Sequence, residues 1–127
     1  MSLLVDAGAC IAFERGDRVV QAFLLKALQT GEVVRTTTAV VAQVWRGGGR
    51  QARLAQLLRG VEEVELTAPR ARAVGALLAK ARTTDIADAT LVELAHDGDE
   101  ILTGDVGDIV HLAVHAKKTL IVTPLGA

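Results

Sequence analysis

The sequence has one cysteine, no tyrosine and no long apolar run among its 127 residues. Because the single Cys10 cannot form an internal disulfide, we expect a reducing compartment, the cytoplasm, with Cys10 as a small core residue rather than a nucleophile. No stretch approaches the roughly 20 apolar residues that a membrane helix needs. The N-terminus reaches Asp6 without a basic segment, so we expect no signal peptide. Half of the residues are hydrophobic, which favours one folded domain with a substantial core.

Aromatic residues and phosphate-binding motifs are also scarce. The chain has only three aromatic residues of the Phe, Trp and Tyr types, namely Phe13, Phe23 and Trp45. Stacking on nucleic-acid bases would therefore be a minor mode of binding. No P-loop motif is present. The three glycines of 47–49 lack a strand before them and are interpreted as a hinge rather than a phosphate loop.

The histidines and the placement of the acids argue against three other chemistries. No Cys/His spacing supports zinc, and His111 and His115, four apart on one predicted helix, are expected at the surface or in a dimer contact. A HAD-type phosphatase would need a second Asp where Gly8 stands. A response-regulator receiver would need a phosphoacceptor Asp at the end of a central strand, whereas these acids group at the start and in the last third.

Charge is unevenly distributed along the chain, although the net charge is only −1. Residues 33–61 carry five arginines and no acid, and residues 67–82 carry four basic residues and no acid. Residues 83–108 then hold eight acids and no Lys or Arg. This segregation could place a basic groove beside an acidic pocket, or it could reflect ordinary solvated helix faces.

Hydrophobic periodicity predicts short strands that alternate with helices. Strands are expected at 3–5, 32–36, 61–66, 100–105 and 119–123. Helices are expected at 7–15, 18–29, 50–59, 68–82, 85–98 (closed by Gly98) and 106–116, with another that carries Gln43 after a Thr cap at 36–38. In the helix 18–29, one face holds Val19, Val20, Phe23, Leu24, Ala27 and Leu28. The pattern favours a single α/β domain of three layers, with helices on both faces of a five-stranded, mostly parallel sheet.

Two aspartates stand just past predicted strands, where open α/β sheets bind ligands. Asp6 follows the first strand, and Asp105 follows the fourth with Asp108 close behind. Asp85 and Asp88 are three apart at a helix start and share a face. Helix capping is the alternative for Asp6 and for one of Asp105 and Asp108, and interaction with the helix dipole is the alternative for Asp85.

Carboxylates that converge at one sheet edge repel each other unless a cation joins them. A hard divalent cation removes this conflict, and oxygen ligands favour Mg²⁺ or Mn²⁺ over zinc. The acidic segment therefore predicts a metal site of this class.

Three segments of the chain resemble a PIN-domain ribonuclease, specifically the VapC-type toxin of bacterial type II toxin–antitoxin pairs. They are "LLVDAGACIAF" at the start, "TTTAVVAQVWR" in the second quarter and "DIADATLVELAHDGDEILTGDVGDI" near the end, so the resemblance covers essentially the whole chain. It implies that Asp6, Asp88 and Asp105 hold the metal, with Asp85 and Asp108 as auxiliary acids. The fourth main acidic position of the family falls on Gln43, which we expect to point into the pocket; a surface Gln43 is the alternative.

The resemblance also implies an activity and partners. We expect metal-dependent cleavage of RNA, a homodimer and a cognate antitoxin that masks the site. Arg46, Arg50 and Arg53 are expected to contact the RNA backbone, which gives affinity without sequence information. A module that binds RNA or a partner with weak or no nuclease activity is the alternative, because Gln43 replaces an acid.

Overall fold

A computed structural model describes residues 1–126 and contains a five-stranded sheet in the order β3-β2-β1-β4-β5. All four pairs of neighbouring strands are parallel, which confirms the predicted α/β class. The strands are β1 (Leu3–Val5), β2 (Val34–Thr37), β3 (Glu62–Val64), β4 (Glu100–Thr103) and β5 (Ile121–Pro124). The strand order reverses beside β1, because β2 and β3 extend to one side of it and β4 and β5 to the other.

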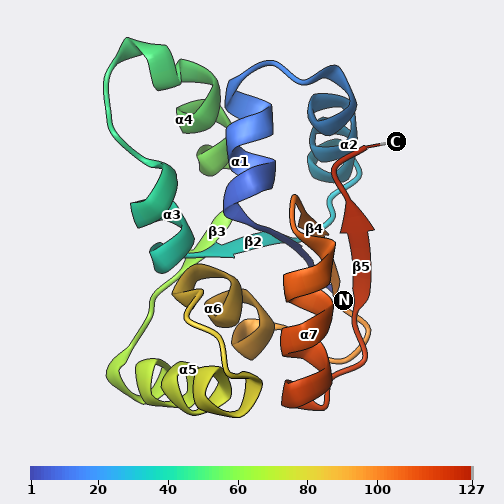
Figure 1. Cartoon of the computed structure of the whole chain (residues 1–127). Helices are drawn as coiled ribbons and strands as arrows, with labels where there is room; N and C mark the ends of the chain where they lie inside the picture. The colour runs from blue at the N-terminus through green and yellow to red at the C-terminus, as the bar shows by residue number, and fades with distance from the viewer. Residues whose placement is uncertain (127) are drawn as a thin grey trace.

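Within residues 1–126, seven α-helices cover the sheet. They are α1 (Ala7–Glu14), α2 (Arg18–Gln29), α3 (Thr38–Val44), α4 (Ala52–Arg59), α5 (Ala68–Ala81), α6 (Ile86–Leu94) and α7 (Val106–Ala116). Figure 1 shows α1, α2 and α4 on one side of the sheet and α5, α6 and α7 on the other. Helix α3 contacts both α1 and α6. This is a three-layer α/β/α arrangement.

Side-chain caps fix where most of the helices begin. Six of these seven α-helices start at an Asp or Thr whose side chain accepts a hydrogen bond from an N–H of the first turn. The capping residues are Asp6, Asp17, Thr37, Thr67, Asp85 and Asp105. The predicted Thr cap before α3 is Thr37. Capping therefore accounts for three of the five aspartates that the sequence proposed as site residues.

Most predicted helices differ from the observed ones by no more than two residues at either end, but two differ in a way that matters for the fold. Helix α6 ends at Leu94 and not at Gly98, because Ala95 is extended and the Asp99 carboxylate accepts a hydrogen bond from the N–H of His96 instead. Helix α2 buries a narrower stripe than its periodicity indicated: Val20, Leu24 and Ala27 are buried. Val19 and Phe23, which the periodicity placed on the same face, are 60% and 36% exposed.

The core lies on both faces of the central strands. All three residues of β1 are fully buried, and so is Ile101 of β4, as expected for a parallel strand between two helical layers. Cys10 of α1 is also fully buried, and desolvation raises the pKa of its thiol to about 12. The burial confirms Cys10 as a core residue, and a raised thiol pKa disfavours the reactive thiolate. No described helix is both long and apolar enough to cross a membrane.

Candidate active site

The candidate site lies at the carboxyl ends of β1 and β4, where the strand order reverses. Asp6 directly follows β1, and Asp105 follows β4 after Gly104. The two strands are neighbours, with Val5 beside Leu102, so their ends bring these aspartates to the same edge. Such a switch in strand order is where open α/β sheets bind their ligands.

Asp6 is held firmly by the protein. It is 3% exposed, and its Oδ1 accepts a hydrogen bond of 2.7 Å from the N–H of Ala9, which caps α1. Its Oδ2 accepts bonds from the Thr103 hydroxyl at 2.6 Å and the Gly104 N–H at 3.0 Å. Burial raises the pKa of Asp6 despite these three donors, and the charge of Asp105 contributes in the same direction. Asp6 therefore caps α1, which was the alternative that the sequence offered, and it also lines the candidate site.

Asp85 and Asp88 come from the start of α6. Asp85 caps the helix by accepting a bond of 3.0 Å from the Asp88 N–H. Asp88 is 6% exposed, and its pKa is raised to about 7, first by desolvation and then by the charges of Asp85 and Asp6. The dipole of α6 favours the ionised form of a first-turn acid, but burial outweighs it. The ionised form of Asp88 is therefore unfavourable in the metal-free protein.

Asp105 and Asp108 come from the start of α7. Asp105 caps this helix by accepting from the Asp108 N–H at 3.3 Å, so only one of the two aspartates is a cap. Asp108 is exposed, and a hydrogen bond to the Asp105 carboxyl raises its pKa, with the charge of Asp105 as the next cause. The sequence alternative of one capping residue in this pair is correct, and one oxygen of Asp108 lies within 4.8 Å of oxygens of Asp85 and Asp88.

These elements enclose a pocket of about 220 Å³, which we call the acidic pocket. Its lining residues are Asp6, Ala7, Gly8, Gln43, Asp85, Asp88, Gly104 and Asp105. Gly8 allows a close approach of α1 to the end of β4, since a Cβ there would lie 3.2 Å from both the Cα and the N of Gly104. Gln43 lines the pocket but is exposed, so it lies at the rim rather than at the floor.

No basic side chain among residues 1–126 forms an ion pair with these carboxylates. Among residues 1–126, no Lys, Arg or His nitrogen lies within 4.0 Å of Asp6, Asp85, Asp88, Asp105 or Asp108; the three ion pairs of this part of the chain lie elsewhere. The N-termini of α1, α6 and α7 supply partial positive charge, and the donor set consists of oxygens. A buried carboxylate among others, with oxygen donors only, fits a hard divalent cation such as Mg²⁺ or Mn²⁺.

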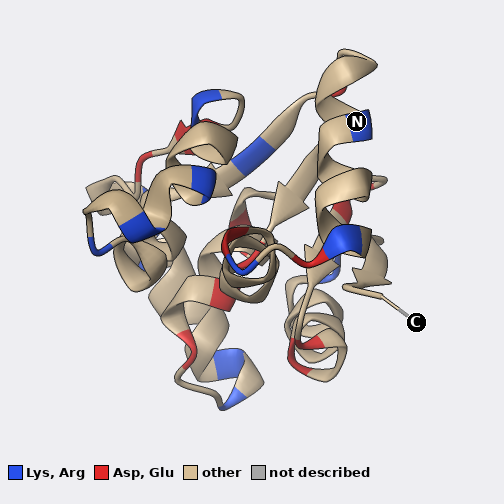
Figure 2. Ribbon diagram, turned by 90° about the horizontal axis from the view of Figure 1, so that it is seen from above, with Lys and Arg blue, Asp and Glu red and all other residues tan. Residues whose placement is uncertain are grey.

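The predicted RNA-binding arginines lie outside this pocket. Arg46, Arg50 and Arg53 are all exposed, and none lines it. The Arg46 guanidinium donates to the carbonyls of Ala42 and Trp45 and so folds back on the end of α3. Figure 2 shows that basic segments lie on several sides of the molecule and are not gathered in one stripe.

Sequence reasoning assigned no role to two buried polar residues. Thr103 donates to Asp6 and accepts from the Asp105 N–H at 2.8 Å, so one hydroxyl joins two site aspartates. Gln51 accepts from the N–H groups of Arg46 and Gly47 and thereby orders the glycine segment. The position of Thr103, two residues before Asp105, could have indicated its role in the site, whereas no sequence feature indicates the role of Gln51.

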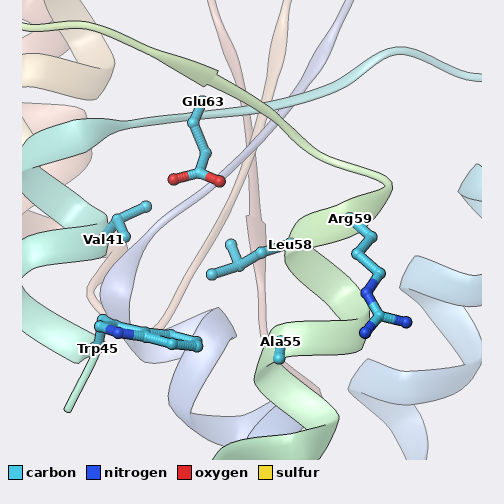
Figure 3. Close-up of a pocket in the computed structure, with 6 residues that line it drawn as sticks. All are labelled: Val41, Trp45, Ala55, Leu58, Arg59 and Glu63. Atoms are coloured by element: carbon cyan, nitrogen blue, oxygen red, sulfur yellow. The ribbon is translucent and has the colours of Figure 1, made fainter. Parts of the chain in front are cut away.

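A second, more apolar cavity of about 440 Å³ lies between α3, α4 and β3, and we call it the Trp45 groove. Figure 3 shows Val41 and Trp45 facing Leu58 across it, with the Glu63 carboxylate at one end. Trp45, the single tryptophan of the chain, is 42% exposed. The groove shares no lining residue with the acidic pocket.

The histidines take no part in either cavity. The Nε2 of His111 lies 2.7 Å from the Ala81 carbonyl, and the His111 and His115 rings are 4.5 Å apart. His96 lies 3.8 Å from Asp99 at the far end of α6. The structure thus offers no zinc-like grouping of histidines among the described residues.

Comparisons with known proteins give no identification: no family model matches the chain, and no curated protein matches it significantly in sequence.

Proposed function

We propose that this protein is a metal-dependent endoribonuclease of the PIN-domain type, the toxin of a toxin–antitoxin pair. The observation that carries the proposal is Asp88, a buried carboxylate that faces four other aspartates at the switch point of a parallel sheet with no basic partner. The α/β/α fold is consistent with the family that the sequence resembles. Without a cation the repulsion among these carboxylates is unfavourable, and a bound metal ion would remove it.

The residues of the acidic pocket suit the cleavage of a phosphodiester. A bound Mg²⁺ or Mn²⁺ would polarise the phosphate and lower the pKa of the attacking water. Asp88 is central to any ligand set, and Asp6 and Asp105 are the other two positions that the resemblance implies. Ala7 and Gly8 line the pocket at the first turn of α1, where N–H groups have no partner within the helix. These groups could hold a phosphate oxygen.

The exposed arginines would supply RNA affinity. Arg46, Arg50 and Arg53 follow α3, the helix that carries Gln43 at the pocket rim. Contacts of this kind neutralise phosphates and depend on salt rather than on base sequence. Gln51 supports this role because it orders the backbone at Arg46 and Gly47.

The partners are a cognate antitoxin and a second copy of the chain, in the cytoplasm. The Trp45 groove supports a protein partner, since its apolar walls and exposed indole fit side chains of an inserted peptide. The homodimer follows from the family resemblance.

A second function is favoured by Gln43, which stands at the pocket rim in place of an acid. In that case the protein would bind RNA or its partner with weak or no nuclease activity. The loss of one anionic oxygen weakens a hard-cation site.

RNA cleavage by the purified chain tests the proposal. Structured and unstructured RNAs are incubated with Mg²⁺, Mn²⁺ or EDTA, using wild type, Asp88→Asn and the exposed control Glu65→Gln. We expect metal-dependent cleavage by wild type and Glu65→Gln, and none by Asp88→Asn. RNA binding without cleavage would instead support the binding module, and neither binding nor cleavage would reject both functions.

A further inference from the structure

The two edges of the sheet differ in charge. The strand order leaves β3 at one edge and β5 at the other. Residues 62–65, which form and follow β3, include three exposed glutamates, and charged side chains keep an edge strand from pairing with another strand. Residues 119–124, which contain β5, have no charged side chain, and Ile121 is exposed there. Strand β5 is therefore the edge that charge does not protect.

Part of the backbone of β5 points away from the sheet. The N–H of Ile121 donates to the Asp99 carbonyl at 2.9 Å, and Ile121 is in register with Glu100 of β4. Because the backbone groups of successive residues point to opposite sides of a strand, those of Leu120 and Val122 point outward. Pro124 also faces outward, where the missing N–H of an edge proline costs no bond within the sheet. These outward groups are available to a further strand.

An apolar stripe on α7 lies beside this edge. Val106, Val110 and Val114 follow one another at intervals of four residues, so they lie along one side of the helix, and all three are exposed. On the other flank, His111 contacts the Ala81 carbonyl at the end of α5. Helix α7 also packs against β5, and Figure 1 shows α7 between α6 and β5. The flank that carries the valines is therefore the one toward β5.

The apolar surface continues past the end of the strand. A Cβ at Gly126 would lie 3.6 Å from Cγ1 of Val19, so the chain after β5 runs beside the start of α2. Val19 is itself exposed. Exposed apolar side chains from α2, β5 and α7 thus surround one edge of the sheet, and such a grouping marks an interaction site.

The charge pattern favours a second copy of the chain at this surface. Two β5 strands in antiparallel pairing place no like charges opposite each other, whereas two β3 strands would bring glutamates together. With Val122 opposite its own copy, the two Val122 residues exchange both backbone bonds, and the N–H of Leu120 meets the carbonyl of Pro124 of the partner subunit. The same two-fold axis sets the α7 helices antiparallel, so the acidic start of each, at Asp108, lies toward the basic end of the other, at Lys117.

We propose that β5 pairs antiparallel with β5 of a second copy, and that the valine stripe of α7 packs against its own copy on one face of the continuous sheet. The proposal rests on the proposed function for the second copy as partner. Because the paired strands are antiparallel, the carboxyl ends of the two sheets point in opposite directions. Each chain then keeps its own acidic pocket open to RNA.

Sedimentation velocity of the full chain in EDTA, over a range of chain concentrations and without RNA, tests the interface. Val110→Lys places a charge at the centre of the stripe, opposite its own copy. Val33→Lys is the matched control, because Val33 is equally an exposed valine but precedes β2, on the far side of β1 from β5. We expect dimers of wild type and of Val33→Lys. The dimer of Val110→Lys should dissociate at least about tenfold more readily, since like charges across an interface are unfavourable.

Amide hydrogen exchange followed by NMR tests the strand pairing itself. The N–H of Ile121 is bonded within the chain, whereas that of Val122 is bonded only in the proposed dimer. We expect the protection of Val122 to rise with chain concentration in wild type and to be lost in Val110→Lys. The protection of Ile121 should be the same in both proteins, which also shows that the variant is folded.

Three results would overturn the proposal: a wild type that is monomeric at every concentration, a dimer that Val110→Lys leaves intact, or a dimer in which Val122 exchanges as fast as in the monomer. RNA cleavage is measured separately, and Val110→Lys should cleave at the wild-type rate per chain because Val110 does not line the acidic pocket. Cleavage by a monomeric wild type would reject the interface alone. The expected dimer without any RNA cleavage would reject the nuclease alone.

Discussion

Replacing Asp88 by Asn should stabilise the metal-free protein at neutral pH and leave its stability near pH 4 unchanged. The substitution keeps the shape of the side chain and removes a charge that is buried beside Asp85 and Asp6. In the folded protein the pKa of Asp88 is raised from 3.8 to about 7, so the folded state retains a proton that the unfolded chain releases. Stability from this group is therefore complete below pH 3.8 and is lost as the pH rises to about 7.

The size of the effect follows from this pKa difference. Each pKa unit corresponds to about 1.4 kcal/mol, so the rise from 3.8 to about 7 gives an upper bound of about 4 kcal/mol. The acidic pocket is open to water and the repulsion is shared with neighbouring acids, which reduces the expected gain to about 2–4 kcal/mol. For a chain of this size, that corresponds to a rise in melting temperature of about 8–16 °C.

Thermal unfolding from pH 4 to pH 8 in EDTA measures the difference between wild type and Asp88→Asn. The difference should grow from near zero at pH 4 to its full value above pH 7, while the exposed control Glu65→Gln follows wild type throughout. Saturating Mn²⁺ should then stabilise wild type more than Asp88→Asn, since ligands that bind only the folded state raise its stability. Parallel curves for wild type and Asp88→Asn, or a less stable variant at pH 8, would refute the reasoning.

Three further predictions concern the surroundings of the pocket. Replacing the three arginines of residues 46–53 by Gln should weaken RNA binding and flatten the slope of log affinity against log salt by about 2, and an unchanged slope in a salt titration would exclude them from the interface. Gln43→Glu should tighten Mn²⁺ binding in a Mn²⁺ titration, because it adds an anionic oxygen at the rim of the acidic pocket. It should change the metal-free stability by less than about 0.5 kcal/mol, because position 43 is exposed. Thr103→Val should cost about 1–3 kcal/mol in denaturant unfolding, because buried Asp6 loses a donor; a variant as stable as wild type would mean that the hydroxyl contributes nothing.

The sequence by itself determined the alternation of strands and helices and the positions of most helix starts. Apolar runs such as residues 3–5 are short, β-favouring and buried on both faces, and the Asp and Thr caps act within three residues of themselves. These are local effects, so they can be predicted from neighbouring residues. The same locality explains why the aspartates after β1 and β4 could be placed at one sheet edge before the strand order was known.

The end of α6 and the exposed face of α2 depended on tertiary contacts. Asp99 holds the N–H groups of both His96 and Ser2, and Ser2 is 97 residues away in sequence. A Gly at position 98 indicated a later helix end, but the bond from Ser2 helps to hold the Asp99 carboxylate where it accepts the N–H of His96, so α6 ends earlier. Val19 looked like a core residue by periodicity but is 60% exposed, because the packing of α2 against the core uses only the stripe of Val20, Leu24 and Ala27.

Only the tertiary structure decided which carboxylates of the site face one another. The sequence placed Asp6, Asp88 and Asp105 together through family resemblance, and all three do line the acidic pocket. The group whose oxygens lie closest together nevertheless contains Asp85 and Asp108 beside Asp88. Asp6 is held instead by the Thr103 hydroxyl, across a sequence separation of 97 residues. Sequence spacing indicates which acids reach the sheet edge, but the packing of α6 against α7 and long-range hydrogen bonds determine which of their oxygens lie together.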